Sequence, residues 1–154
     1  MNFFTYSIRN QNLKTPSNLY NYFINELGLL DFNPYNPNYE KNSLLLDYNN
    51  YYCNPPFNNI EPFVDYHINN VKNGFNSILL LPIRLNTNWF MKLLNFGADF
   101  YIIGRIKYND LGYAPFDSML VDITGCSSRM CFAKKFNGLN KHKFIQVSMF
   151  DLGV

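Results

Sequence analysis

Cysteine is scarce in this chain, and long uncharged hydrophobic runs are absent from it. Only three cysteines occur in 154 residues, an odd number without the spacing of a disulfide framework, which favours a reducing compartment. No uncharged stretch approaches the roughly 20 apolar residues of a membrane span, and the N-terminus lacks a signal-peptide pattern. These absences predict a cytoplasmic protein without membrane association.

Charged residues are also few, at 16 % of the chain, and their sign is unevenly distributed. Residues 126–154 carry a net charge of +4, whereas the remainder carries −2. This asymmetry indicates an anionic partner for the C-terminal segment, although a solvated basic tail is an equal alternative. The candidate nucleic-acid-binding residues are the basic side chains of that segment, which are Arg129, Lys134, Lys135, Lys141 and Lys143.

Apolar residues are abundant, at 47 % of the chain, with aromatic residues at 18 %. Such a composition is typical of a folded protein that buries a core. Neither an internal repeat nor a linker divides the sequence. We therefore predict a single domain over residues 1–154, with residues 126–154 as a basic C-terminal extension.

Three segments have helical periodicity and signals at their ends. In the first, Thr15 is the expected N-cap, Pro16 suits the first turn and Gly28 suits the C-terminal stop. In the second, Asn58 or Asn59 is the expected N-cap. The helices are predicted over residues 15–28, 58–74 and 87–97, the last beginning near Thr87 and ending at Gly97.

Short apolar runs lie between and after these helices and predict strands. The alternation of strands and helices predicts an α/β fold with a mostly parallel sheet. Since the last two strands follow one another without a helix, the sheet is expected to have an antiparallel edge strand. The strands are predicted over residues 29–34, 77–82, 99–108 and 118–123, with one or two more within 42–53.

The stretch "YYCNPPF", residues 51–57, ends one of these strands and precedes a helix. Ligands of such sheets bind at the carboxyl ends of strands. There the Asn54 side chain and the Pro55 carbonyl offer two hydrogen-bond acceptors, and both prolines stiffen the loop. Phe57 adds a flat apolar face that can stack on a planar ligand.

Two fixed acceptors beside a flat ring suit a planar base with an exocyclic amine. If each acceptor takes one amine hydrogen, the nitrogen becomes more tetrahedral and its lone pair can attack an electrophile. Fixed dipoles placed where charge develops are a common source of rate enhancement. On these four residues alone, an ordinary helix-entry turn is an equal alternative.

The loop resembles motif IV of the amino-methyltransferases, and residues 15–123 resemble the phage-type DNA adenine-N6 methyltransferases (Dam-like family). Five blocks carry the resemblance in order, over roughly 70 % of the chain. They are "TPSNLYNYFINELGLLDFNP", "YYCNPPFNNIEPFV", "ILLLPIRLNTNWF", "IIGRIKY" and "APFDSMLV".

The resemblance implies a compact Rossmann-like fold, S-adenosylmethionine as the methyl donor, and no metal. It implies adenine-specific DNA methylation in a bacterial or virus-infected cell. By the same resemblance, Asn54 and the Pro55 carbonyl hold the target amine, Pro56 belongs to the catalytic loop, and Phe57 stacks on the flipped base. The implied cofactor residues are Thr15, Pro16, Asp31, Asn33, Pro34 and Asp47.

The cofactor region departs from the family pattern in two ways. Asn33 stands where the family has an acidic residue before proline, so Asp31 is the expected partner of the cofactor ammonium group. The segment 35–53 is short for the usual ribose-binding strand. Within it, Asp47 suits the adenine or ribose rim of the cofactor, and Glu40 is the other acidic candidate.

Several further residues have ordinary interpretations. His67 lies on the apolar face of its helix and is expected to pack in the core. The spacing of Cys126, Cys131 and His142 matches no strong zinc pattern. Two roles are open for Trp89 and Phe90, which are packing in the core and lining the pocket for the base. Phosphate or cofactor contacts and surface ion pairs are equally open for Arg84 and Arg105.

Two rival functions remain open at this point. The same loop would serve methylation of cytosine-N4, RNA adenine or a glutamine amide, and a catalytically inactive nucleic-acid-binding or assembly subunit would need no complete cofactor site. The chain also has no segment long enough for a separate target-recognition domain. Recognition is therefore expected to be relaxed, or to be supplied by a homodimer or a partner subunit.

Overall fold

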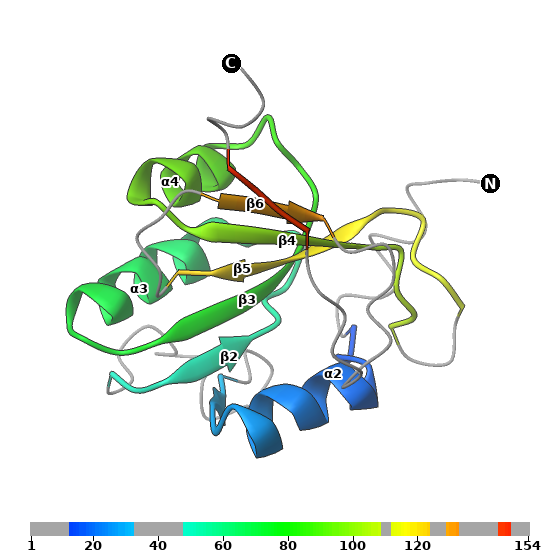
Figure 1. Cartoon of the computed structure of the whole chain (residues 1–154), viewed down its shortest axis with the longest axis horizontal. Helices are drawn as coiled ribbons and strands as arrows, with labels where there is room; N and C mark the ends of the chain where they lie inside the picture. The colour runs from blue at the N-terminus through cyan, green and yellow to red at the C-terminus, as the bar shows by residue number, and fades with distance from the viewer. Residues whose placement is uncertain (1–12, 33–47, 109–111, 124–128, 133–144, 149–154) are drawn as a thin grey trace.

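The computed structural model describes residues 13–32, 48–108, 112–123, 129–132 and 145–148, the last two ranges as backbone only. These residues form a mixed sheet of seven strands in the order β1-β2-β3-β5-β4-β6-β7 (Figure 1). The predicted α/β architecture is confirmed. The strands are β1 (Leu30–Asp31), β2 (Tyr51–Cys53), β3 (Ser77–Pro82), β4 (Asp99–Gly104), β5 (Ser118–Asp122), β6 (Arg129–Phe132) and β7 (Ile145–Ser148).

The sheet is parallel at one end, where β1 pairs with β2 and β2 with β3. Strand β5 runs antiparallel to both of its neighbours, β3 and β4. The predicted antiparallel strand over residues 118–123 therefore exists, but it lies inside the sheet and not at its edge. The helix between β3 and β4, α4 (Asn88–Phe96), connects two strands that are not neighbours, and β5 lies between them in the sheet.

Strands β6 and β7 extend the sheet beyond β4, and the sequence analysis did not predict them. Strand β6 is parallel to β4, and β7 is antiparallel to β6, so β7 is the antiparallel edge strand. Part of the expected basic extension thus continues the sheet. None of the helices in the described residues is long and apolar enough to span a membrane.

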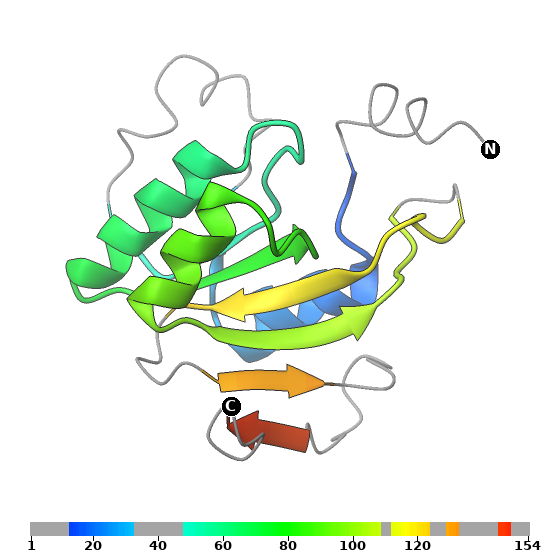
Figure 2. The ribbon, with the colours of Figure 1, turned by 90° about the horizontal axis from the view of Figure 1, so that it is seen from above.

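The helices cover both faces of the sheet, as Figure 2 shows. Helices α3 (Glu61–Lys72) and α4 (Asn88–Phe96) pack side by side on one face. Helix α2 (Ser17–Asn21) continues directly into a π-helical turn, η1 (Tyr22–Glu26), on the other face. Apolar side chains between the sheet and each helical layer form two separate clusters.

The ends of α4 follow the sequence signals, whereas the start of α3 does not. The Thr87 hydroxyl accepts a hydrogen bond from the Phe90 amide at 3.4 Å, and Gly97 ends α4 with φ of 90°. The N-cap of α3 is Ile60, without a side-chain cap, so capping by Asn58 or Asn59 is wrong. The reason is a tight turn before the helix, in which the Asn59 amide bonds the Pro56 carbonyl.

The first helix also begins differently from the prediction. Its N-cap is Pro16 and no side chain caps it, so the predicted N-cap role of Thr15 is wrong. The Thr15 hydroxyl instead bonds residues that are 37 and 39 positions away in the sequence. The C-terminal stop is as predicted, because Gly28 has a φ of 65°, a value that suits glycine.

The core accounts for three residues whose role the sequence left open or assigned to packing. Trp89 and Phe90 are both buried in the cluster beneath α3 and α4. His67 is fully buried in α3, where its Nδ1 lies 2.9 Å from the Ser77 hydroxyl. These three side chains therefore pack in the core, on the helical face opposite α2.

Candidate functional site

The Asn-Pro-Pro-Phe loop follows β2 at the carboxyl end of the parallel strands, where the strand order predicts it. A second segment, Leu13–Pro16, immediately precedes α2 and lies against this loop. The Asn54 Nδ2 atom donates to the Leu13 carbonyl at 2.6 Å and to the Thr15 hydroxyl at 3.3 Å. The fold thus joins two segments that are about 40 residues apart in the sequence into one site.

These contacts determine which way the Asn54 amide faces. A backbone carbonyl only accepts hydrogen bonds, so the atom that faces Leu13 has to be the amide nitrogen. The Oδ1 atom then faces away from Leu13. Asn54 is only 8 % exposed, and its Oδ1 is buried without a hydrogen-bond partner in the part of the chain that the structure describes. A buried acceptor without a donor has a desolvation cost that a bound donor would remove.

Tyr52 supports Thr15 from beneath the loop. The two hydroxyl groups lie 2.5 Å apart, and burial strongly raises the pKa of the Tyr52 phenol, so it remains protonated at neutral pH. The Tyr52 ring stacks on Phe23 with centroids 4.4 Å apart and an interplanar angle of 13°. The hydroxyl that helps to orient Asn54 is therefore held by a rigid core residue.

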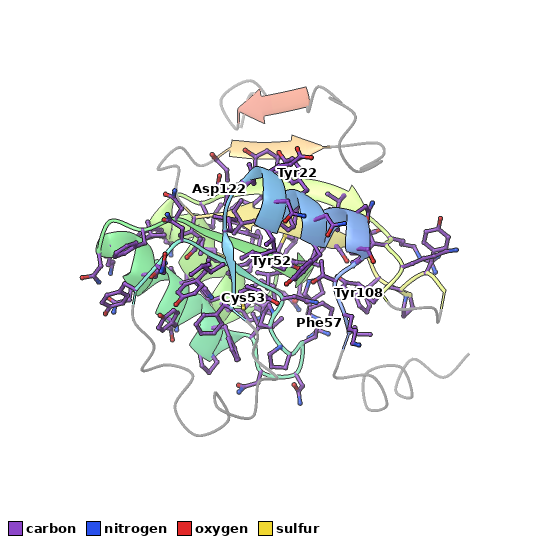
Figure 3. All side chains as sticks on the ribbon, turned by 90° about the horizontal axis from the view of Figure 1, so that it is seen from below. Tyr22, Tyr52, Cys53, Phe57, Tyr108 and Asp122 are labelled. Carbon is purple, nitrogen blue, oxygen red and sulfur yellow. The ribbon has the colours of Figure 1, made fainter. Side chains whose placement is uncertain are left out.

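Phe57 is half-buried and lies beside two aromatic rings of the segment that connects β4 to β5. It meets Tyr108 and Phe116 edge to face, each with centroids 5.6 Å from its own. Figure 3 labels Phe57 and Tyr108 on the ribbon. Neither of the two contacting rings lies parallel to the Phe57 ring. The Phe57 carbonyl accepts a hydrogen bond from Arg84 at 3.2 Å. These contacts fix the position of Phe57 and leave it without a stacking partner among the described residues.

Asp31 ends β1, the strand next to β2, and is half-buried. Burial raises the pKa of its carboxyl group, and a hydrogen bond from Tyr20 partly lowers it. No cation among the described residues contributes to its pKa. Burial and, to a smaller extent, the charge of Asp31 raise the pKa of the Cys53 thiol. Asp31 pairs in register with Tyr52, two residues before Asn54, which places it near the base of the loop.

The structure brings together some of the predicted site residues and leaves others outside its description. The carboxyl ends of β1 and β2 bring together Thr15, Pro16, Asp31 and the loop 54–57. Of the remaining predicted residues, Arg129 begins β6 with only its backbone described. The others lie outside the described residues, namely Asn33, Pro34, Glu40, Asp47, Cys126, Lys134, Lys135, Lys141, His142 and Lys143.

Sequence reasoning missed the Leu13 carbonyl, Tyr52 and Tyr108 as parts of this site. No pattern in the sequence marks a backbone carbonyl, and Tyr52 has the apolar spacing of any buried strand residue. Tyr108 is fully buried, and its hydroxyl lies 3.0 Å from that of Ser118. Its spacing from Phe116 across a turn was the one usable signal, because paired aromatics flanking a turn often pack together.

The described residues contain no group of three or more histidine, cysteine or acidic side chains arranged to hold a metal ion. Comparisons of the chain with family models, with curated proteins and with solved structures found no match. The site itself and the motif order in the sequence are therefore the basis for proposing a function.

Proposed function

We propose that this chain transfers a methyl group from S-adenosylmethionine to the exocyclic amine of adenine in DNA. The observation that carries this proposal is the orientation of the Asn54 amide. Its nitrogen is held by Leu13 and Thr15, while its Oδ1 is buried and lacks a described partner. Pro55 and Phe57 follow it in the same loop. A helix-entry turn alone does not need a side-chain oxygen that is left unpaired by the described residues, whereas an amine-binding site needs an acceptor that the protein itself does not use.

The residues at the neighbouring strand end fit the charge of the methyl donor. S-adenosylmethionine carries an ammonium group, and Asp31 is a half-buried carboxylate with a raised pKa. An ammonium group within hydrogen-bond distance would offset the cost of burying that carboxylate. Thr15 bonds the hydroxyl of Tyr52, and Tyr52 is the residue that pairs with Asp31 in the sheet. When bound, the sulfonium group of the donor supplies an electrophilic methyl carbon.

The chain's own groups would act on the amine as follows. Asn54 Oδ1 and the Pro55 carbonyl each accept one amine hydrogen, and Phe57 stacks on the base after it leaves the duplex. The nitrogen lone pair, now directed out of the base plane, would form the new N–C bond while the bond between the methyl carbon and the sulfur of the donor breaks, which leaves S-adenosylhomocysteine as the second product. The methylated nitrogen then loses one hydrogen as a proton to solvent. Neither described partner of Asn54, a carbonyl and a hydroxyl, is a base at neutral pH.

The test combines cofactor binding with identification of the product. Purified chain is titrated calorimetrically with S-adenosylmethionine, then incubated with mixed-sequence DNA and a donor carrying an isotopically labelled methyl group. Nucleosides from the digested DNA are separated by mass spectrometry. Labelled N6-methyladenine that disappears in Asn54→Ala supports the proposal.

Other outcomes point to the rival functions. Labelled N4-methylcytosine would identify a different planar amine as the target. Neither heat of binding nor label in any nucleoside, at millimolar donor, would overturn the proposal and favour an inactive binding subunit.

A further inference from the structure

Basic side chains gather around the Asn-Pro-Pro-Phe loop within the described part of the chain. Arg84 follows β3, and Arg105 and Lys107 follow β4, so all three lie near the carboxyl ends of these strands. All three are exposed. We refer to Arg84, Arg105 and Lys107 as the rim cations.

Contacts to the loop place the rim cations around the candidate site. The Arg84 Nη1 atom donates to the Phe57 carbonyl at 3.2 Å. Arg105 and Lys107 lie just before Tyr108, whose ring meets that of Phe57. Arg105 Nε donates to the Ala114 carbonyl at 2.6 Å, which ties its side chain to the loop that carries Phe116.

No carboxylate neutralises the rim cations among the described residues. The guanidinium groups bond backbone carbonyls, and the Lys107 ammonium lies 5.0 Å from the centre of the Tyr113 ring. Lys92, on α4, is different because it forms ion pairs of 2.8 Å with both Glu61 and Asp65. The rim therefore presents positive charge that no carboxylate in the described part of the chain neutralises.

An aromatic ring stands beside this charge. Tyr113 is 62 % exposed, the largest exposed fraction among the large apolar side chains that the structure describes. Exposed aromatics alternating with cations are the elements that bind the backbone and bases of an unpaired strand. Arginine held in one orientation by a carbonyl retains further N–H groups that can bind phosphate in a fork.

We propose that the rim cations bind backbone phosphates of the DNA strand that carries the target base, with Arg84 on a phosphate next to that nucleotide. This inference rests on the proposed function, because it takes DNA as the substrate. It assigns phosphate binding to the rim of the site itself, separately from the basic residues of the C-terminal segment. Since Arg84 bonds Phe57, the same residue would link phosphate binding to the position of the stacking ring.

The test measures DNA affinity as a function of salt concentration. Fluorescence anisotropy is recorded with a labelled mixed-sequence duplex for the parent chain, Arg84→Gln, Lys107→Gln and the control Lys72→Gln. Lys72 lies at the other end of α3, near Phe96, and loses the same charge. Each lost phosphate contact should reduce the slope of log K against log salt by about 0.9, and the control should retain the parent slope.

A charge-conserving variant separates phosphate binding from a displaced Phe57. Arg84→Lys keeps the charge but loses the fork, so it should keep the parent salt slope at somewhat lower affinity. If Arg84→Gln and Lys107→Gln both bind with the slope of the Lys72→Gln control, or if the parent chain binds no DNA, the inference is overturned.

Methylation assayed in parallel distinguishes this failure from failure of the proposed function. If the rim variants methylate DNA and bind it with the salt slope of the control, phosphate binding by the rim cations is wrong and the proposed methyl transfer is supported. If DNA binding depends on the rim cations but the parent chain transfers no methyl group, phosphate binding by the rim cations is supported and the proposed activity is not.

Discussion

Asn54→Ala is the sharpest perturbation that the structure offers. It removes the buried Oδ1 that we assign to the target amine, and it also removes the nitrogen that bonds Leu13 and Thr15. The expected result is a loss of turnover with almost unchanged affinity for S-adenosylmethionine, because the ammonium contact is assigned to Asp31 and because Thr15 keeps its bond to Tyr52.

The structure gives magnitudes for both activity and stability. Losing one positioned hydrogen-bond partner of a transition state reduces turnover by about 10²- to 10³-fold, equivalent to roughly 3–4 kcal/mol. The Leu13 carbonyl loses its side-chain donor, and an unsatisfied buried group lowers the free energy of unfolding by about 1–3 kcal/mol. Typical domains have about 5–15 kcal/mol of stability, so the variant should remain folded at 25 °C.

Thr15→Val provides a graded comparison. It removes the hydroxyl that lies 2.5 Å from the buried Tyr52 hydroxyl, which should lower the free energy of unfolding by about 1–3 kcal/mol. At Asn54 it keeps Oδ1 and the 2.6 Å bond to Leu13 and removes only the hydrogen bond at 3.3 Å. One neutral hydrogen bond is worth about 0.5–1.5 kcal/mol, so turnover should fall only about two- to tenfold.

The assay is single-turnover methyl transfer at saturating cofactor, with urea denaturation of each variant to confirm folding. If folded Asn54→Ala methylates DNA at the parent rate, Oδ1 has no role in the reaction and the loop is an ordinary turn.

Three further predictions concern the stacking ring, the cofactor carboxylate and a buried histidine. Phe57→Ala should raise the KM for DNA by roughly 5- to 150-fold, since stacking is worth about 1–3 kcal/mol, and steady-state kinetics showing an unchanged KM would contradict it. Because the pKa of Asp31 is raised, the affinity for S-adenosylmethionine measured by calorimetry should begin to decline at a higher pH than it would with an ordinary carboxyl group. Asp31→Asn should bind the donor weakly at every pH. Binding like that of the parent chain would show that Asp31 does not hold the ammonium group. Burial lowers the pKa of His67 from 6.5 to about 3, so the folded state stays neutral while the unfolded state takes up a proton below its own pKa. Stability should therefore decrease as pH falls from about 6.5 towards 3, by roughly 2 kcal/mol at about pH 5, and urea titrations should show a smaller decrease for His67→Phe.

Local signals in the sequence were sufficient for most of the secondary structure. Helix α4 begins at the capping hydroxyl of Thr87 and ends at Gly97 with its positive φ, as predicted, because both effects depend only on neighbouring residues. The apolar run of β3 predicted a buried strand for the same reason. The sequence also placed Asn54–Phe57 after a strand and before a helix, where a ligand of an α/β sheet is expected.

The tertiary structure decided what these residues contact. Thr15 looks like a helix cap in isolation, but the fold brings it to Tyr52 and Asn54, and those bonds replace the capping bond. The position of β5 inside the sheet depends on which neighbours it can pair with, not on its own residues. The orientation of the Asn54 amide likewise depends on the Leu13 carbonyl, which lies 41 residues away in the sequence. Long-range contacts of this kind leave no periodicity or spacing in a sequence, so only the folded chain shows the acceptor on which the proposed chemistry depends.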